Sequence, residues 1–389
     1  MLESTPPFSP RHAVQLIMVS DQAAPNLLPA LDPAMKPKQI VMLVTDRMRA
    51  RADCLSQAFT EAGIKVSMAH LGAGASTDYE NIQKTVYDVL ETNEPTEVAL
   101  NLTGGTKLMA IAARSAMQDS GARSFYVDIE SGDLIWLDDP IAHQKLKSTV
   151  RLSSYLKAYG FDVHSKAEVP GVPVAQQQLF TTLVNDIGAL GHALTQLNWL
   201  GQKAERDDTL SIPISEAGAS NQNLDALIAH FERAEMIERR GDTLYYKTKG
   251  ARDFCKGGWL ERLVYQQVEA LTGPLAIRDK AMGLEIKRDS VRNELDVAFL
   301  HANRFFVIEC KTALMDHQTR PNKANDTVFK LDNIANRVGG LGYRTMLVSY
   351  RSFSKPEESL VRALNVRLVQ GRDIKNLESH LRDWVSVQR

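Results

Sequence analysis

The fold of the C-terminal third is decided by two segments, VRNELDVAFL at residues 291–300 and RFFVIECKT at residues 304–312. Their apolar and β-branched residues, separated by a short polar turn, predict a β-hairpin. Side chains alternate between the faces of a strand, so Glu294 and Asp296 share one face of the first strand. The second strand is otherwise too apolar for a solvent-exposed edge of a sheet.

The charged residues of this hairpin predict a metal-dependent site. Glu309 and Lys311 share one face of the second strand, and buried carboxylates are costly unless a partner or cation neutralises them. Two carboxylates about 4 Å apart repel by about 4 kcal/mol at an effective dielectric of 20. A hard divalent cation removes this repulsion and activates water, and Lys311 can stabilise charge developing on a phosphate. The pattern is typical of a metal-dependent phosphodiesterase, and the simpler alternative is two surface salt bridges.

The hairpin resembles the core of the PD-(D/E)XK nucleases. The Asp of that family falls on Asp296, and its Glu-X-Lys falls on Glu309 and Lys311. The family often has a Glu on the preceding helix, and the segment GGWLERLVY predicts a helix that brings Glu261 near the strands. The resemblance implies that Mn²⁺ or Mg²⁺ is bound by Glu261, Asp296 and Glu309. It implies the catalytic residues Glu261, Asp296, Glu309 and Lys311, with Glu294 as a plausible additional acid.

Composition limits the class of protein. The chain has 389 residues, 44% hydrophobic and 24% charged, which suits a globular protein of two or three domains. No apolar run is long enough for a membrane span, and no signal peptide is visible. Cys54, Cys255 and Cys310 are isolated, so neither a disulfide framework nor a zinc site is expected. These features predict a cytoplasmic location without a membrane partner.

Charge is distributed unevenly along the chain. Residues 251–389 contain 23 Lys and Arg against 17 Asp and Glu, a net charge of +6. Residues 1–250 contain 23 against 30, a net charge of −7, which together gives the overall −1. The positive part carries the nuclease-like hairpin, which suits a polyanionic substrate such as DNA or RNA.

The first 150 residues alternate between strand-like and helix-like segments. The predicted strands are at 12–19, 39–45, 64–70, 97–102 and 123–128. Helical segments after the second, third and fourth strands imply right-handed βαβ units and a parallel, Rossmann-like sheet, giving an α/β domain at 1–155. A turn at Ser131–Leu134 predicts a terminal hairpin.

The remaining chain divides into three parts. Residues 151–175 are interpreted as a connector. Two helical segments followed by a two-strand wing around Gly241 predict a winged-helix-like module at 176–250, interpreted as a spacer rather than a DNA reader. The nuclease-like domain, with a mixed sheet, is expected at 251–389.

A glycine-rich loop after the fourth strand, NLTGGTKLMA at 101–110, has features of an anion site. Glycines permit a tight turn with exposed N–H groups, and the next helix begins here with its positive end toward the same space. It is neither a P-loop, because Leu108 follows Lys107, nor a dinucleotide fingerprint. The simpler alternative is a helix-capping turn.

Two more loops are expected at the same edge of the sheet. They are Ser20–Gln22, after the first strand, and 72–77, after the third, in which Ser76 or Thr77 is expected to cap the next helix. With the strand order 3-2-1-4-5, the first loop faces the glycine-rich loop across the switch point.

The order of these parts resembles the CARF-domain ancillary nucleases of type III CRISPR defence, over nearly the whole chain. The resemblance implies a homodimer with a cyclic oligoadenylate, usually cyclic tetra-adenylate, across its two-fold axis. A four-phosphate ring needs two symmetric loops, which a dimer supplies. Binding would activate cleavage of DNA and/or RNA with little sequence preference. The implied activator contacts are Thr103, Gly104, Gly105, Thr106 and Lys107, with Ser20, Asp21 and Gln22.

Other functions remain open at this stage. The main alternative is a cyclic-oligoadenylate-responsive transcriptional regulator that uses the winged module to bind DNA and the nuclease fold as a scaffold. A restriction-type nuclease without a second messenger is another. Candidate substrate contacts, each with packing or solvent exposure as its alternative, are Tyr343, Tyr350, Phe353, Lys323, Lys330 and Arg337.

Overall fold

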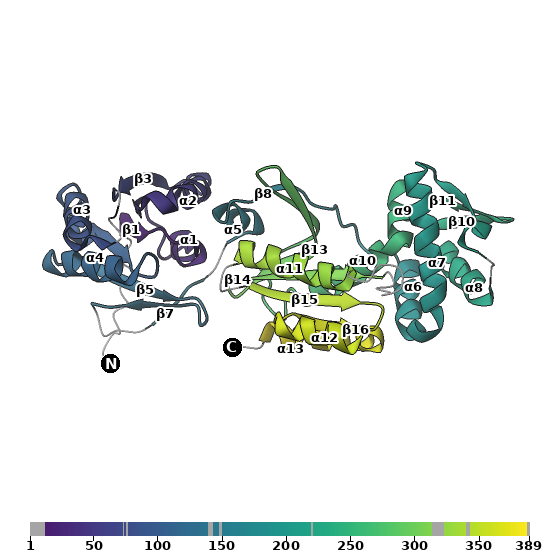
Figure 1. Cartoon of the computed structure of the whole chain (residues 1–389). Helices are drawn as coiled ribbons and strands as arrows, with labels where there is room; N and C mark the ends of the chain where they lie inside the picture. Colours follow the sequence, from purple (N-terminus) through teal and green to yellow (C-terminus); the bar gives the residue numbers. More distant parts are fainter. Residues whose placement is uncertain are drawn as a thin grey trace, which may run out of the picture.

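The chain folds into three lobes that lie in a row (Figure 1). The computed structural model describes residues 12–72, 74, 77–138, 143–147, 150–218, 221–312, 323–339 and 343–386. The lobes are an N-terminal lobe (12–158), a central lobe (162–165 with 254–386) and a distal lobe (174–253). Within these described ranges, no helix is both long and apolar enough to cross a membrane.

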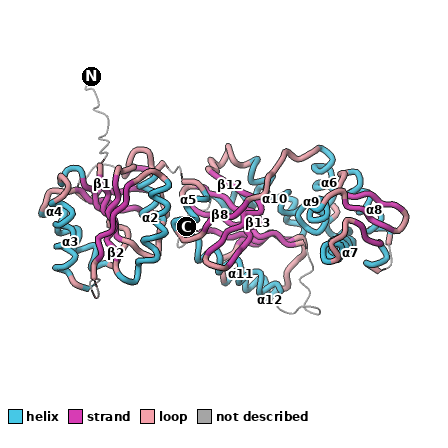
Figure 2. The backbone as a smooth tube through the Cα atoms, turned by 90° about the horizontal axis from the view of Figure 1, so that it is seen from above, coloured by secondary structure: helices cyan, strands magenta, loops and turns pink. Residues whose placement is uncertain are grey.

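A seven-stranded sheet forms the middle of the N-terminal lobe. Its elements are β1 (Val14–Met18), α1 (Ala24–Leu31), β2 (Gln39–Val44), α2 (Arg49–Glu61), β3 (Lys65–His70), α3 (Tyr79–Glu91), β4 (Val98–Asn101), α4 (Lys107–Asp119), β5 (Arg123–Asp128), β6 (Asp133–Trp136) and β7 (Gln144–Lys145). The order is β3-β2-β1-β4-β5-β6-β7, with the first five strands parallel, which confirms the predicted parallel sheet and matches the assumed order 3-2-1-4-5. Helices cover both faces (Figure 2), so the inner strands are almost wholly apolar.

The central lobe is built on a mixed six-stranded sheet. Its elements are β8 (Asp162–Ser165), α10 (Trp259–Ala270), β12 (Asp279–Arg288), β13 (Val291–His301), β14 (Arg304–Lys311), α11 (Lys323–Gly339), β15 (Tyr343–Ser349), α12 (Lys355–Ala363), β16 (Arg367–Gln370) and α13 (Leu377–Ser386). The order is β16-β15-β14-β13-β12-β8, and β14 pairs antiparallel with β13 and parallel with β15. Phe306 and Ile308 pack toward α10 and α13, whereas Phe305 and Val307 pack toward α11. The hairpin is therefore buried on both faces, as its sequence predicts.

The distal lobe has the helices and wing of the predicted winged module. Its elements are α6 (Val174–Asn185), α7 (Ile187–Arg206), β9 (Ser211–Pro213), α8 (Gln222–Arg233), β10 (Ile237–Arg240), β11 (Thr243–Tyr246) and α9 (Lys249–Asp253). The strands form a small antiparallel sheet in the order β10-β11-β9. Gly241 takes φ +61° at the tip of the wing, where a left-handed residue closes the hairpin.

Three interpretations of the sequence need correction. Residues 151–175 are more than a connector, because they form α5 (Leu152–Ala158), which packs against both the N-terminal and the central lobe, and β8, which pairs with β12. The distal lobe is also not a spacer. It lies on the far side of the central lobe, although it precedes most of that lobe in sequence (Figure 1). Ser76 and the side chain of Lys323 fall outside the described residues. The cap expected from Ser76 or Thr77 is made instead by Asp78, whose side chain accepts from the backbone N–H of Asn81 at 3.0 Å, while the Thr77 hydroxyl donates to the carbonyl oxygen of Gly74.

Candidate functional site

Two adjacent strands of the central sheet bring three predicted catalytic residues together. Asp296 lies within β13, while Glu309 and Lys311 lie at the carboxyl end of β14. The Nζ atom of Lys311 is 2.5 Å from Oε1 of Glu309 and 3.9 Å from Oδ2 of Asp296. Only 9% of Asp296 and 6% of Glu309 is exposed. The hairpin therefore holds two carboxylates and an amine in a nearly buried cluster.

Burial and neighbouring charges shift the pKa values of this cluster. Burial and, next, the charge of Glu309 raise the pKa of Asp296 well above its usual range, and Lys311 only partly opposes this. Burial raises the pKa of Glu261, in the first turn of α10, from 4.5 to about 7, with Glu294 as the next cause. For Lys311, burial lowers the pKa, but Glu309 and Asp296 outweigh burial and raise it overall. The amine is therefore protonated, and the two remaining predicted residues, Glu261 and Glu294, belong to the same electrostatic cluster.

A π-helical turn (Phe254–Gly258) brings the start of α10 close to the end of β14. Gly257 takes φ +145°, and a Cβ there would lie 2.5 Å from Oγ1 of Thr312, so only glycine fits. The Thr312 hydroxyl is hydrogen-bonded to the amide of Asn198 on α7, 3.1 Å away. The distal lobe thus supports the junction between the two elements that carry Glu261 and Lys311.

The cluster fits a hard divalent cation by its chemistry. Among the residues that the structure describes, no group of three His, Cys, Asp or Glu side chains is arranged to hold a metal ion unaided. The residues Glu261, Asp296 and Glu309 nevertheless supply only oxygen donors, which Mg²⁺ and Mn²⁺ prefer. Burial raises the pKa of Glu261 and of Asp296, and a cation beside them would favour their charged forms. Such an ion would take further ligands from water or a phosphate oxygen.

A buried amide network fixes the base of the glycine-rich loop. The side-chain amide of Asn101, the last residue of β4, donates to the carbonyl oxygen of Pro25 at 2.9 Å and to Oδ1 of Asn26 at 3.1 Å. The Pro25 carbonyl is free to accept because Pro29, one turn later in α1, has no N–H. The hydroxyl of Thr103 donates to Oδ1 of Asn101 at 2.8 Å. The loop is therefore shaped by neutral, satisfied hydrogen bonds.

The residues of the loop have different structural roles. Gly104 is buried, and a Cβ there would lie 2.0 Å from the carbonyl oxygen of Met18. Gly105 takes φ +74°. The hydroxyl of Thr106 accepts from the backbone N–H of Met109 at 3.2 Å and so caps α4, which begins at the exposed Lys107. Gly104 therefore serves close packing, whereas Gly105 and Thr106 face open space.

Two cavities meet at this loop. One, of 440 Å³, is lined by Ser20, Asp21, Arg47, Gly72, Gly105 and Thr106, among others. The other, of 660 Å³, is lined by Ser20, Asp21, Gln22, Thr103, Gly105, Tyr126, Glu130, Arg304 and Arg344, among others. The Ser20–Gln22 loop and the glycine-rich loop thus share both cavities, as the strand order predicts, while Gly104 and Lys107 line neither.

Family models match both ends of the chain. Residues 14–155 match the Card1 CARF domain, and residues 248–388 match the Card1-like endonuclease domain. The chain belongs to the CARF-domain nucleases. The glycine-rich loop and its cavities therefore lie in the CARF domain, and the acid–lysine cluster lies in the endonuclease domain.

Solved structures share this fold over most of the chain. Protein VC1899 from Vibrio cholerae is 24% identical, with a TM-score of 0.87 over 97% of this chain and 99% of that one. Can2 from Sulfobacillus thermosulfidooxidans, in complex with cyclic tetra-adenylate, is 23% identical, with a TM-score of 0.81 over 96% and 99%. A type III CRISPR defence DNA nuclease activated by cyclic oligoadenylate is 19% identical, with a TM-score of 0.56 over 88% and 46%. No curated protein matches the chain.

The three aromatic candidates for substrate contact in the endonuclease domain are held by packing or by hydrogen bonds. Tyr350 and Phe353 are buried, and the Tyr350 hydroxyl donates to the carbonyl oxygen of Leu183 at 3.1 Å. The half-buried Tyr343 is hydrogen-bonded through its hydroxyl to Asn336 at 2.8 Å. Among the candidates whose side chains the structure describes, Lys330 and Arg337 are exposed on α11 and so are open to a nucleic acid.

The wing of the distal lobe offers little free positive charge. Arg239 is 2.6 Å from Asp225, and Arg240 is 2.8 Å from Glu238. Arg240 also lies over the ring of Tyr245. Because acids within the lobe already pair with these arginines, the wing is poorly suited to bind a phosphate backbone.

Sequence reasoning missed a cation in the CARF cavity. Arg47 lines the 440 Å³ cavity and lies 3.8 Å from Asp21, which is also 3.6 Å from Arg51. The signal was present, because Thr45, Asp46 and Arg47 directly follow the second strand and so lie at the same edge of the sheet. The pairing also gives Asp21 a structural partner.

Proposed function

We propose that this protein is a metal-dependent endonuclease of type III CRISPR antiviral defence, activated by cyclic tetra-adenylate. It acts on DNA and/or RNA with little sequence preference, as a homodimer in the cytoplasm. The observation that carries the proposal is the nearly buried cluster of Asp296, Glu309 and Lys311, in a chain that also has a preformed CARF cavity. The Can2 complex, which has the same fold, supports cyclic tetra-adenylate as the activator.

The proposed reaction is phosphodiester hydrolysis. Asp296 and Glu309, with Glu261 beside them, would hold Mn²⁺ or Mg²⁺, which lowers the pKa of bound water and shields phosphate charge. The backbone N–H of Cys310 donates to Oδ2 of Asp296 at 2.6 Å and so fixes this carboxylate. Lys311 is protonated, so its Nζ acts as a donor that holds the attacking water or a phosphate oxygen rather than as a base.

The activator site is proposed at the CARF cavities. Phosphate oxygens would meet the N–H groups of Gly105 and Thr106, with Lys107 at the positive end of α4 and Arg47 nearby. Asp21 is acidic and so would contact ribose or adenine. Because one chain has one glycine-rich loop, a ring of four phosphates needs the loop of a second copy, which a two-fold dimer provides.

One assay tests the proposal as a whole. The purified protein is incubated with Mn²⁺ and labelled single-stranded DNA, single-stranded RNA or plasmid, with and without cyclic tetra-adenylate. We expect cleavage that needs both the metal and the ring, and the cleaved substrate identifies the preference. Full activity without the ring would indicate a restriction-type nuclease. Tight, sequence-specific duplex binding without cleavage would indicate the regulator.

A further inference from the structure

The turn of the catalytic hairpin rests on the CARF domain. β13 ends at His301 and β14 begins at Arg304, and the two residues between them take positive φ angles, which closes a tight turn. The guanidinium of Arg304 donates to the backbone carbonyl oxygen of Glu130 at 2.5 Å. A Cβ at Gly132 would lie 3.7 Å from the side-chain amide of Asn303. The tip of the hairpin therefore meets the turn between β5 and β6.

Hydrogen bonds connect the end of β5, just before this turn, to the glycine-rich loop. The hydroxyl of Thr103 accepts the backbone N–H of Val127 at 2.8 Å, while the N–H of Leu102 donates to the carbonyl oxygen of Phe125 at 2.9 Å. Val127 lies near the end of β5, and Glu130 follows three residues later in the turn between β5 and β6. A change in the position of the loop is therefore passed to the Glu130 carbonyl through short, directional bonds.

Arg304 also lines the ligand cavity itself. The 660 Å³ cavity is bounded by Thr103 and Gly105 on the CARF side and by Arg304 and Arg344 on the endonuclease side. Arg304 is 7% exposed, and its guanidinium has more donors than the one bond to Glu130 uses. An anion in this cavity would therefore bind the Arg304 guanidinium and change its bond to the Glu130 carbonyl, which joins the two domains.

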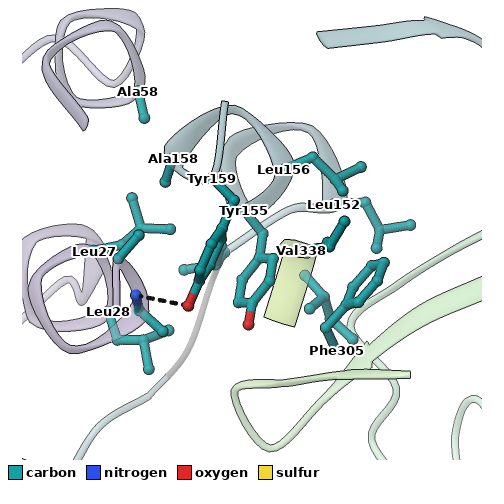
Figure 3. Close-up of a cluster of buried hydrophobic side chains, with 14 of the residues drawn as sticks. Leu27, Leu28, Ala58, Leu152, Tyr155, Leu156, Ala158, Tyr159, Phe305 and Val338 are labelled. Carbon is teal, nitrogen blue, oxygen red and sulfur yellow. Dashed lines mark hydrogen bonds between the residues drawn. The ribbon is translucent and has the colours of Figure 1, made fainter. Parts of the chain in front are cut away.

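A second contact beside the turn is apolar and rigid. Figure 3 shows α5 between the domains, with Tyr155 stacked on Phe305 at 5.5 Å between ring centroids and 12° between planes. The hydroxyl of Tyr159 accepts the backbone N–H of Ala24 at 3.3 Å. Close-packed cores change little in shape, so this cluster suits a pivot, whereas the single bond of Arg304 is the contact that can change.

The strand that begins at Arg304 ends at the catalytic residues. β14 runs from Arg304 to Lys311, about 23 Å at 3.3 Å per residue. It is bonded to β13 on one side and to β15 on the other. A tilt of the hairpin therefore moves Asp296, Glu309 and Lys311 together relative to Glu261, which lies on α10 outside the hairpin.

We propose that Arg304 is the positioning residue through which the CARF loop controls the endonuclease site. This inference rests on the proposed function. Occupation of the CARF cavity alters the bond between Arg304 and the Glu130 carbonyl, the hairpin tilts on the pivot formed by Tyr155 and Phe305, and the acid–lysine cluster reaches its active geometry. The chemical step itself does not involve Arg304.

The test measures activation rather than activity alone. Cleavage rates of wild type, Arg304→Ala and Arg304→Lys are measured with Mn²⁺, with and without saturating cyclic tetra-adenylate, together with ring binding by calorimetry and thermal midpoints. Each variant is assayed at a ring concentration that saturates it, and we expect the activation ratio of Arg304→Ala to fall about tenfold. Arg304→Lys keeps one donor and should recover part of the ratio. Arg278→Ala, an exposed arginine at the same end of the sheet, is the matched control.

The possible results separate a failure of the role proposed for Arg304 from a failure of the proposed function. An Arg304→Ala variant that is activated as strongly as wild type would overturn the inference. So would a loss of ring-free activity with a lowered thermal midpoint, because Arg304 would then support folding alone. If the wild-type protein neither binds the ring nor responds to it, the proposed function fails instead, and Arg304 is not at issue.

Discussion

The two functional regions of this chain use opposite physical means. The CARF loop is shaped by neutral hydrogen bonds, in which the side chains of Asn101 and Thr103 donate to oxygen acceptors. The endonuclease cluster gathers carboxylates around one lysine and keeps the pKa values of Asp296 and Glu261 raised. The first region is preorganised at little cost, whereas the second is strained until positive charge arrives. Removing a hydrogen-bonding side chain from the loop should therefore lower the stability of the fold, whereas neutralising an acid of the cluster should raise it.

The largest effect is expected on catalysis. Lys311→Ala removes the protonated amine 2.5 Å from Glu309 and should lower the ring-activated cleavage rate about a thousandfold. Lys355→Ala, an exposed lysine at the start of α12, is the control and should leave the rate unchanged. Equal rates for Lys311→Ala and wild type in a single-turnover assay would show that the Lys311 amine does not stabilise charge on the phosphate.

The next effect is a pH-dependent gain in stability for Glu261→Gln. The folded-state pKa of Glu261 is raised from 4.5 to about 7, so the native protein holds a proton that the unfolded chain releases. Its stability should therefore fall as pH rises from 4.5 to 7, and the variant should avoid a loss of about 2–3 kcal/mol. Urea unfolding with a chelator present, at several pH values, measures the difference.

The control for that measurement is a glutamate whose substitution should lower stability. Glu205 bonds to Lys256 at 2.6 Å, which lowers its pKa, so Glu205→Gln should lose stability at neutral pH. A Glu261→Gln variant that is less stable than wild type at pH 7 would show that the cluster is not strained.

A smaller effect is expected in the CARF loop. Asn101→Ala leaves the Pro25 carbonyl and the Asn26 side chain without their donor, which should cost about 1–3 kcal/mol and weaken ring binding. Asn223→Ala, on an exposed face of α8, should cost far less. Unfolding curves and calorimetric titration with cyclic tetra-adenylate provide the two measurements, and unchanged values for Asn101→Ala would show that the network does not shape the loop.

The smallest effect is expected in the wing. Arg240→Ala breaks an exposed pair with Glu238 and should change cleavage less than about twofold, since such pairs contribute little. A large loss of DNA cleavage or duplex binding in this variant would instead support the regulator hypothesis.

The two regions also differ in how far the sequence predicts them. The parallel strands of the CARF domain and the hairpin follow from their apolar segments and from the helical segments between strands, whereas the order 3-2-1-4-5 was only a condition of the sequence analysis. The helix α1 was missed, since Pro25 and Pro29 are signals against a helix, yet the missing N–H of Pro29 is what frees a carbonyl for Asn101. Such a role depends on residues that are 75 positions apart in sequence, as Asn101 and Asn26 are.

The contacts between lobes were equally hidden. β8 has the polar sequence DVHS and becomes a strand only because β12 offers it an edge. Arg304 was predicted only as the first residue of the second strand of the hairpin, and the fold brings it to Glu130. Local patterns therefore lead to the proposed catalytic residues, whereas the residues proposed to connect the two sites depend on tertiary structure.

The most direct test of the account is a titration of Mn²⁺ against cleavage rate at saturating cyclic tetra-adenylate. Wild type and Asp296→Asn are compared on the substrate that wild type cuts fastest. We predict that the wild-type rate rises with Mn²⁺ and saturates, while Asp296→Asn stays near background although it binds the ring equally well. Cleavage by Asp296→Asn at the wild-type rate, or metal-independent cleavage by wild type, would contradict the account.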